Sequence, residues 1–600
     1  MSRAAPFFLL LLLIGLAALA LGADTPAAAL LFAAVFAAFT AIVMIFTRGV
    51  VGGLALAGLI GSSLLFGVAV LNNWTSTGAG EYAVLVSTFG VFAVAQIASR
   101  EGRSFETLWR ATIVIGSLLA GASFIDFIID PEMFWGVFDR PYGGNRFSTP
   151  FLSANTAATF YGVIAILSLT ELIQVGRRFG RGGRVEIEVL SKSLVIPIVG
   201  LLLSLTCVFL TASRAGITLL AGAMLLLTLW QLIRDAKARG RLNLKVAGVS
   251  VAVVFLISVV FAISGGVYAD RMSVTVGDDG RVVTFIAYLE AIGLAPVFGN
   301  GLGGFTYINS LIANAQNARM IMFQGAAHNI ALQWLLQGGI VGLAFILAIG
   351  FSWVRIMGRG LARRSRHTAY IRAAIITALF VCAHGMFDYA LEIPAFLFLF
   401  AWICGLGAGV ATGGSRTLGP GRWFGVSRAT NFAAAAILVM ASGLSFWAFA
   451  DRISARQIIA MDAEQFRSRF ASESDLSGSP ARLGAIGDRA LRLETPDAGL
   501  AARAFSLASE AEPRDGVLQA RLAVARIAEL GMITPDAVAA LSRSYTVMPY
   551  APRELVDWRL DIVEGVWRYM PPLIQDAAIR EARAYGQTAR IERFTAASGP

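Results

Sequence analysis

The sequence predicts an all-α, polytopic membrane protein with a soluble helical region at its C-terminal end. Of its 600 residues, 57% are hydrophobic and only 14% are charged, which lies outside the range of soluble globular domains. The hydrophobic residues form long blocks, and about 20 apolar residues are enough for a helix to cross the hydrocarbon core. Residues 451–600 contain no such block and are rich in Ala, Arg and Glu.

Roughly thirteen blocks reach the length of a membrane span. They cover residues 6–22, 26–46, 50–71, 82–98, 107–125, 155–174, 193–211, 215–233, 246–265, 329–354, 371–387, 393–411 and 431–450. These blocks predict a transmembrane domain over 1–450 and a separate region over 451–600. The first block also resembles a cleavable signal peptide, but an uncleaved span is the expectation for a polytopic protein.

The placement of basic residues predicts the orientation. With a cytoplasmic N-terminus, 24 of the 49 Lys and Arg fall in cytoplasmic segments, 6 in periplasmic segments and 19 in the C-terminal region. The opposite orientation violates the positive-inside rule. The net charge of +11 is therefore a topology signal rather than a sign of nucleic-acid binding. The C-terminal region and a long loop over 266–328 are predicted to be periplasmic.

The long loop contains an apolar helical pattern followed by a glycine-rich turn. The apolar positions are Val282, Val283, Phe285, Ile286, Leu289 and Ile292. They fit a helix lying on the membrane surface, and equally a helix packed on neighbouring spans. The turn, Gly299-Asn300-Gly301-Leu302-Gly303-Gly304, lets the backbone approach a partner closely, and a phosphate cradle is one interpretation.

The C-terminal region has a rhythm of short amphipathic helices broken by Pro and Gly. This rhythm suggests stacked helical hairpins of the tetratricopeptide-like kind, although no strict 34-residue repeat is present. The region has no histidine or cysteine. We therefore expect it to bind or space a partner, such as another protein, rather than to catalyse a reaction.

Six basic residues of the transmembrane domain fall on the predicted periplasmic side, where topology disfavours them. They are Arg140, Arg146, Arg214, Arg271, Arg281 and Arg319. A snorkelling anchor or an ion pair is the structural explanation for such a residue. Asp139 beside Arg140 favours that explanation, as does Asp270 beside Arg271.

Arg214 has a stronger functional case because it opens a predicted span. A cation at a helix N-terminus opposes the macrodipole at a cost of roughly 0.3–1 kcal/mol. That cost is offset if the arginine and the helix amides together hold an anion such as a diphosphate. Arg281, which opens the loop helix, and Arg146 are further candidates.

His328 is one of three histidines and begins a predicted span. The helix dipole and nearby arginines disfavour the imidazolium, which keeps a neutral imidazole available as a general base. An interfacial histidine that caps the helix is the structural alternative. His384 and Asp388 form a second polar patch, and they share a helix face if the helix continues that far. A structural role and a catalytic role for this pair are both compatible with the sequence.

Some chemistries have no matching motif in the sequence. The predicted periplasmic loops carry no close carboxylate cluster suited to a divalent metal apart from Asp278-Asp279-Gly280, which fits a turn, and there is no Walker loop. Cys207, Cys382 and Cys404 all fall within predicted spans, away from any periplasmic disulfide. We expect no metal and no cofactor.

Several segments together resemble the O-antigen ligase and polymerase superfamily, whose members share a many-spanning membrane fold with a large periplasmic loop. The segments are Thr211 to Gly216, the Arg281 helix with Ala295 to Gly301, His328-Asn329 running into Gln333 and Gly338-Gly339, and Arg146 to Asn155. The resemblance covers roughly residues 30–410. Where the family usually has a proline-asparagine dipeptide, this chain has Ser153-Ala154-Asn155.

The resemblance implies metal-independent glycosyl transfer from an undecaprenyl-diphosphate-linked glycan at the periplasmic face of the bacterial inner membrane. Arg214 and Arg281, with Arg146, would hold the diphosphate, and His328 would activate the acceptor hydroxyl. Supporting roles would fall to Asn329, Asn155, His384, Asp388, Gly299 and Gly301.

The family includes O-antigen ligases acting on the lipid A core, polysaccharide polymerases and protein O-oligosaccharyltransferases. A C-terminal region able to pass on a growing polysaccharide favours a polymerase. A polysaccharide transporter or lipid flippase is the alternative from another class. Ionisable residues near mid-bilayer would favour the transporter, whereas the polar candidates here cluster at the outer span ends. A structural scaffold, whose membrane part only anchors the C-terminal region, is a further alternative. It would not explain the presence of Arg214 and His328 at span ends.

Overall fold

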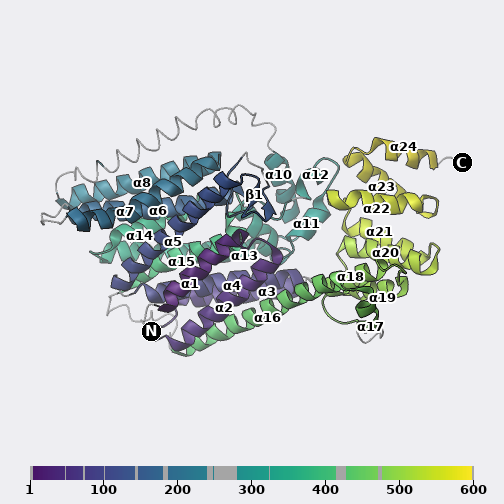
Figure 1. The fold of residues 1–600 in the computed structure, drawn as a ribbon, viewed down its shortest axis with the longest axis horizontal. Helices are drawn as coiled ribbons and strands as arrows, with labels where there is room; N and C mark the ends of the chain where they lie inside the picture. The colour runs from purple at the N-terminus through teal and green to yellow at the C-terminus, as the bar shows by residue number, and fades with distance from the viewer. Residues whose placement is uncertain are drawn as a thin grey trace.

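A computed structural model shows an all-α polytopic architecture (Figure 1). The structure describes all residues except 1–4, 48, 72–74, 101, 142–145, 180–186, 240–247, 249–279, 323, 414–427, 471–475 and 598–600. The helices of its membrane region are α1 (Ala5–Leu19), α2 (Pro26–Phe46), α3 (Gly53–Leu71), α4 (Thr75–Ala98), α5 (Gly102–Ile129), α6 (Ala154–Phe179), α7 (Ile187–Leu210), α8 (Arg214–Arg239), α13 (Ile330–Arg363), α14 (Thr368–His384), α15 (Pro394–Thr412) and α16 (Arg428–Ala460).

Ten of the described helices are long and apolar enough to cross a membrane, and α1 and α14 are shorter apolar helices. Each predicted block coincides with one of these twelve helices, except 246–265, which lies outside the described residues. The sheet found in the described part of the chain is a two-stranded antiparallel ribbon, β1 (Met133–Phe134) with β2 (Phe138–Asp139). The all-α polytopic prediction is confirmed.

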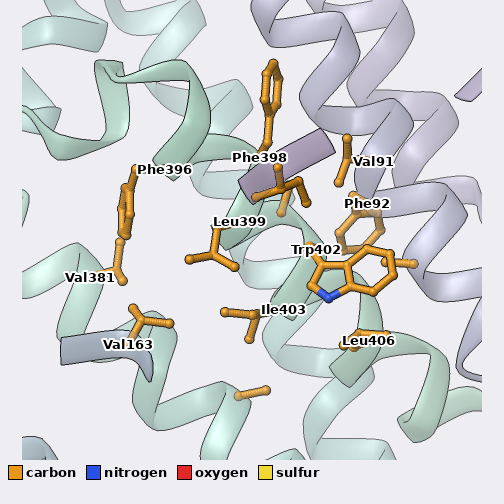
Figure 2. Close-up of a cluster of buried hydrophobic side chains, with 14 of the residues drawn as sticks. Val91, Phe92, Val163, Val381, Phe396, Phe398, Leu399, Trp402, Ile403 and Leu406 are labelled. Atoms are coloured by element: carbon orange, nitrogen blue, oxygen red, sulfur yellow. The ribbon is translucent and has the colours of Figure 1, made fainter. Parts of the chain in front are cut away.

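Helix α15 forms the centre of the membrane bundle. Its side chains Phe396, Phe398, Leu399, Trp402, Ile403 and Leu406 point into a buried cluster with residues of α4, α6 and α14 (Figure 2). The Trp402 indole N–H donates to Thr112 Oγ1 of α5 at 3.0 Å, so this buried polar atom has a partner. Burial on all sides explains why α15 is apolar around its whole circumference.

The two ends of the bundle differ in their polar residues. At one end, Arg177 of α6 pairs with Asp235 of α8 (Nε to Oδ2, 2.8 Å), and Arg372 of α14 donates to Gln231. These residues belong to the predicted cytoplasmic side. The first turns of α6, α8 and α13 lie at the opposite end, where the candidate site residues were expected.

The long loop contains α10 (Gly280–Ile292), α11 (Phe305–Ile312) and α12 (Ala318–Ile321). Tyr288 and Ala291 of α10 are buried in a small cluster with Phe305, and Phe285 packs against it. The exposed side chains of the same helix are Val282, Val283, Ile286 and Leu289. The predicted apolar face is therefore divided: one part packs on neighbouring helices and the other is exposed.

The C-terminal region is a succession of short helices. They are α17 (Ala463–Arg469), α18 (Pro480–Leu491), α19 (Ala498–Ala511), α20 (Gly516–Leu530), α21 (Pro535–Val547), α22 (Arg553–Gly565), α23 (Pro572–Ala584) and α24 (Thr588–Ala597). They share one hydrophobic cluster that begins at Ala455, on the last turns of α16. Residue 450, the predicted boundary, lies inside α16, which runs unbroken from the membrane region into this hydrophobic cluster and ends at Ala460 (Figure 1).

Candidate active site at one end of the bundle

Arg146 joins three segments of the site. Its Nε donates to the Thr211 carbonyl at 2.9 Å, and its Nη2 lies 3.4 Å from Asn155 Oδ1. Thr211 belongs to the turn before α8, and Asn155 belongs to the first turn of α6. The predicted Arg146–Asn155 stretch and the predicted Arg214 motif therefore meet in space.

Arg214 is the first residue of α8, and it is exposed. Ser213 caps the helix, since its Oγ accepts the Gly216 amide at 3.2 Å. Gly216 also lets α8 lie close to α6, because a Cβ there would stand 2.8 Å from the Ala158 Cβ. The geometry places the Arg214 guanidinium at a helix N-terminus beside the start of α6, an arrangement that suits an anion.

His384 is buried at the end of α14 and is linked to α6. Its Nδ1 lies 2.6 Å from Thr159 Oγ1, and that hydroxyl donates to the Asn155 carbonyl at 3.0 Å. Helix α14 ends at His384, so Asp388 does not share a helix face with it. Asp388 is instead buried in the following turn, where its Oδ2 accepts the Ala390 amide at 3.1 Å.

The His328-Asn329 segment is fastened to this same turn. Asn329 caps α13, because its Oδ1 accepts the amides of Ala331 and Leu332, and its Nδ2 donates to the Met386 carbonyl at 3.1 Å. The helix cap is therefore Asn329, and the structural alternative of a capping histidine does not describe His328. His328 adopts a positive φ of 53°, which is uncommon for a residue with a side chain.

A small hollow, open to solvent, lies beside His328. It is lined by His328, Asn329, Ile330, Gln333, Asp388, Tyr389, Leu391 and Glu392. The His328 ring meets the Tyr389 ring edge to face, with centroids 4.6 Å apart. The hollow thus places an imidazole, two carboxyl groups and a phenol around one space.

Glu392 is a site residue that sequence reasoning missed. It ends the short helix η4 (Ala390–Glu392), which follows the Asp388 turn. Burial, and secondarily the Glu81 carboxylate, raise the pKa of Glu392 to about 8. An acid between two apolar spans is the sequence signal that identifies it.

The glycine-rich turn packs against a break in α13. The Asn300 and Gly301 amides donate to the carbonyls of Leu336 and Gln337 at 2.9 and 2.8 Å. A Cβ on Gly299 would stand 2.5 Å from the Gln337 carbonyl carbon, so only glycine fits there. Two amides of the suggested phosphate cradle are therefore used within the protein, and the positions of Gly299 and Gly301 are explained by close backbone packing.

Gly339 supplies the other half of this contact. Its backbone angles, φ 60° and ψ −160°, break the helical path inside α13. The break lets the Ile340 and Val341 amides donate to Pro296 and Val297 in the loop. The loop before α11 is thus paired with α13 on both sides of Gly339.

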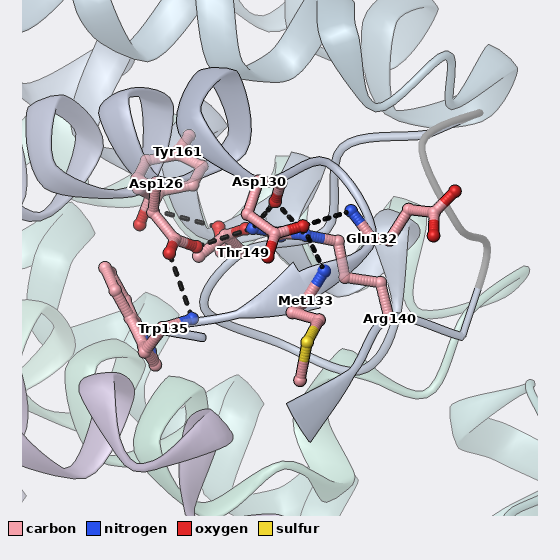
Figure 3. A network of polar contacts seen from close by, with 9 residues as sticks. Asp126, Asp130, Glu132, Met133, Trp135, Arg140, Thr149 and Tyr161 are labelled. Carbon is pink, nitrogen blue, oxygen red and sulfur yellow. Dashed lines mark hydrogen bonds and ion pairs between the residues drawn. The ribbon is translucent and has the colours of Figure 1, made fainter. Parts of the chain in front are cut away.

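Two of the six basic residues on this side have structural partners. Arg140 is buried, and its Nη2 lies 2.5 Å from Asp126 Oδ2, while it also donates to Thr149 and the Asp130 carbonyl (Figure 3). The expected pairing with the adjacent Asp139 is wrong, because Arg140 turns inward toward α5. Arg319 donates to the Ala584 carbonyl at 2.7 Å.

The remaining two arginines cannot be placed in the site in the same way. Arg271 and the Arg281 side chain lie outside the described residues, although the Arg281 backbone forms the first turn of α10. Within the described ranges, no group of three or more His, Cys, Asp or Glu is arranged to hold a metal ion. The expectation of a metal-free site stays a prediction.

Comparison with known proteins agrees with this geometry. Residues 199–347 match the family described as O-antigen ligase. No curated protein matches the chain. The match includes Arg214, Arg281 and His328, whereas Arg146 and His384 lie outside it and join the site through the contacts above. This match over residues 199–347 supports the resemblance of the chain to the O-antigen ligase and polymerase superfamily.

Proposed function

We propose that the protein transfers a glycan from an undecaprenyl-diphosphate carrier to a sugar acceptor at the periplasmic face of a bacterial inner membrane. The observation that supports this most directly is the contact of Arg146 with the turn before Arg214, at the same end of the bundle as His328. An anion site and a base beside an open hollow are parts that such a transfer needs.

The diphosphate would be held by Arg214, Arg146 and Arg281. A guanidinium presents paired N–H donors that match phosphate oxygens, and the α8 N-terminus adds backbone amides and a partial positive charge. The fixed charges of these three arginines would stabilise the diphosphate as negative charge develops on it. Arginines would thereby supply, without a metal ion, the charge that a leaving group requires.

His328 would act as the general base. The acceptor hydroxyl oxygen forms a bond to the anomeric carbon, the bond from that carbon to the phosphate oxygen breaks, and the diphosphate leaves with the electron pair. The hydroxyl proton passes to His328. The positive end of α13 and the arginines nearby disfavour an imidazolium before the reaction, which keeps the base free of a proton.

The hollow beside His328 would receive the acceptor sugar. Asp388 and Glu392 offer hydrogen-bonding groups for sugar hydroxyls, and Tyr389 offers an aromatic surface. Because its pKa is about 8, Glu392 is mostly protonated at neutral pH and can donate a hydrogen bond. Asn329 and Gln333 would keep the turn that carries His328 in place.

Polymerisation of O-antigen or exopolysaccharide is the form of the reaction we favour, with the C-terminal helices positioning the growing chain or a protein partner. Ligation to the lipid A core or to protein uses the same chemistry with another acceptor. The surface profile of a deletion strain separates these cases. Loss of all surface-attached O-chain indicates a ligase, and attachment of single repeat units indicates a polymerase.

The proposal is tested by turnover of an undecaprenyl-diphosphate glycan by the purified full chain in lipid. His328→Ala should lower turnover by roughly 10²–10⁴-fold while donor binding remains, since a neutral imidazole attracts an anionic lipid little. His367→Ala is the matched control, because His367 caps α14 at the other end of the bundle. Transfer should also persist in excess chelator.

Normal turnover in His328→Ala would eliminate the base assignment. Loss of donor binding in that variant would instead assign His328 to the diphosphate site. Movement of the lipid-linked glycan across the membrane without any new glycosidic bond would establish the transporter alternative.

A further inference from the structure

The C-terminal helices contact the long loop close to His328. Ala313 and Ala318, which flank the turn between α11 and α12, share a buried apolar cluster with Tyr550 and Ala584 of the C-terminal region. Met322 and Tyr585 pack against this cluster from the two sides. In Figure 1, α11 and α12 accordingly lie next to α22 and α23.

Arg319 provides a polar contact at this junction. Its Nε donates at 2.7 Å to the carbonyl of Ala584, the last residue of α23. Carbonyls at a helix C-terminus have no partner within the helix and lie at the negative end of its dipole, so a guanidinium is favourable there. Gly586 makes room for it, because a Cβ there would stand 2.9 Å from Arg319 Nη2.

A second arginine strengthens the junction from the opposite direction. The Arg514 guanidinium, between α19 and α20, lies over the Tyr307 ring of α11 at 5.1 Å. Contacts therefore run both ways: Arg319 reaches from the loop to the C-terminal helices, and Arg514 reaches from those helices to the loop.

Hydrogen bonds hold residues 324 and 327, which lie just before His328. Gln324 is fixed by Asn309, whose Nδ2 donates to its carbonyl at 2.8 Å, and by the Tyr288 hydroxyl at 3.1 Å from its Oε1. The Ala327 amide donates to Gln333 Oε1 at 2.7 Å. A displacement of α12 is therefore transmitted within a few residues to the turn that carries His328.

That turn depends on its surroundings. His328 has a φ of 53°, and such a conformation persists only where neighbouring contacts impose it. Groups that react must also be held close to one geometry, because small misplacements slow a reaction strongly.

We propose that the C-terminal helices hold the His328 turn in its reactive position through α11 and α12, with Arg319 as a positioning residue. The catalytic part of this inference rests on the proposed function. Its mechanical part, the link between the C-terminal helices and the turn, does not.

The test uses the full chain in lipid and two measurements. Arg319→Ala should speed amide hydrogen exchange in residues 305–328, and it should lower turnover about tenfold with less than about a twofold change in the donor KM. Arg319→Lys should restore most of both, because a lysine can still donate to the Ala584 carbonyl. Gly586→Ala should act like Arg319→Ala, from the other side of the contact.

Arg593→Ala is the matched control. Arg593 lies on α24 in an exposed pair with Glu564, away from the junction. Wild-type exchange and turnover in Arg319→Ala would overturn the proposal, as would equal effects of Arg593→Ala. If the wild-type chain transfers no glycan but exchange responds as expected, the proposed function fails and the mechanical link is supported.

Discussion

Arg214 is the exposed first residue of α8, at the end of the bundle where Arg146 contacts the preceding turn. Arg214→Ala should therefore weaken donor binding and slow transfer together. Arg214→Lys should rescue only part of the loss, because a point charge does not reproduce the planar fork of donors. Donor affinity and turnover are measured side by side. Arg359→Ala, near the other end of α13, is the control.

Retention of full donor affinity in Arg214→Ala would remove this residue from the diphosphate site. If Arg214→Lys restored donor affinity and turnover fully, the role of Arg214 would be explained by its charge alone, without bidentate binding of phosphate.

The pH dependence of stability follows from Glu392. Its pKa is about 8 in the folded protein against an ordinary value of 4.5, so the folded state keeps a proton that the unfolded chain releases. The free energy of unfolding should therefore fall as pH rises from about 4.5 to about 8. Thermal unfolding in detergent should show a flatter profile in Glu392→Gln than in the wild type. The exposed Glu290→Gln is the control, and an unchanged slope in Glu392→Gln would contradict the assignment.

Sequence reasoning located most of the residues that converge here, yet it did not reveal their partners. Arg214 and His328 stand out because a polar residue at a span end is conspicuous in an apolar chain. His384 contacts Thr159, which is 225 residues away in the chain, and no spacing rule predicts such a pair. Arg140 shows the opposite error, since its neighbour Asp139 suggested a local pair, while the real partner is Asp126.

Among the elements, the break in α13 is the feature that the sequence pattern conceals. The apolar run over 329–354 is continuous, so hydropathy predicts one straight span. The break exists because loop residues 296–301 pair with the helix around Gly339, and that pairing depends on tertiary contacts. Helices were predictable from the length of apolar runs, whereas a loop that packs into a helix was not.

Gly339→Ala tests this element. A φ of 60° with ψ near −160° is a region that only glycine occupies readily, and an added Cβ would stand 2.4 Å from the Val297 carbonyl. We expect a loss of about 2–5 kcal/mol of stability, seen as a lower midpoint of thermal unfolding. Gly350→Ala in the same helix, where a Cβ meets nothing within 4 Å, should be nearly neutral. Equal midpoints in the two variants would show that the break is not required.

At the scale of the whole molecule, the C-terminal helices and the long loop must lie on the same side of the membrane, because Arg319 of the loop contacts Ala584. The distribution of Lys and Arg, 24 against 6, predicts that this side is the periplasm. The contact and the charge bias are independent observations. The contact predicts that the two segments share a side of the membrane, and the charge bias predicts which side it is.

Topology reporters that work only in the periplasm provide that experiment. A reporter fused after residue 600 and one inserted within 266–328 should both be active. One inserted within 180–186 should be inactive, since the end of α6 carries Arg177 and Arg178 and the start of α7 carries Lys192, all predicted to be cytoplasmic. Two reporters that disagree with each other would contradict the contact between Arg319 and Ala584. Two inactive reporters, with an active one at 180–186, would be consistent with the fold but would show that its orientation in the membrane is the opposite of the predicted one. Every proposed site residue would then face the cytoplasm, and a carrier-linked glycan in the outer leaflet could not be the donor.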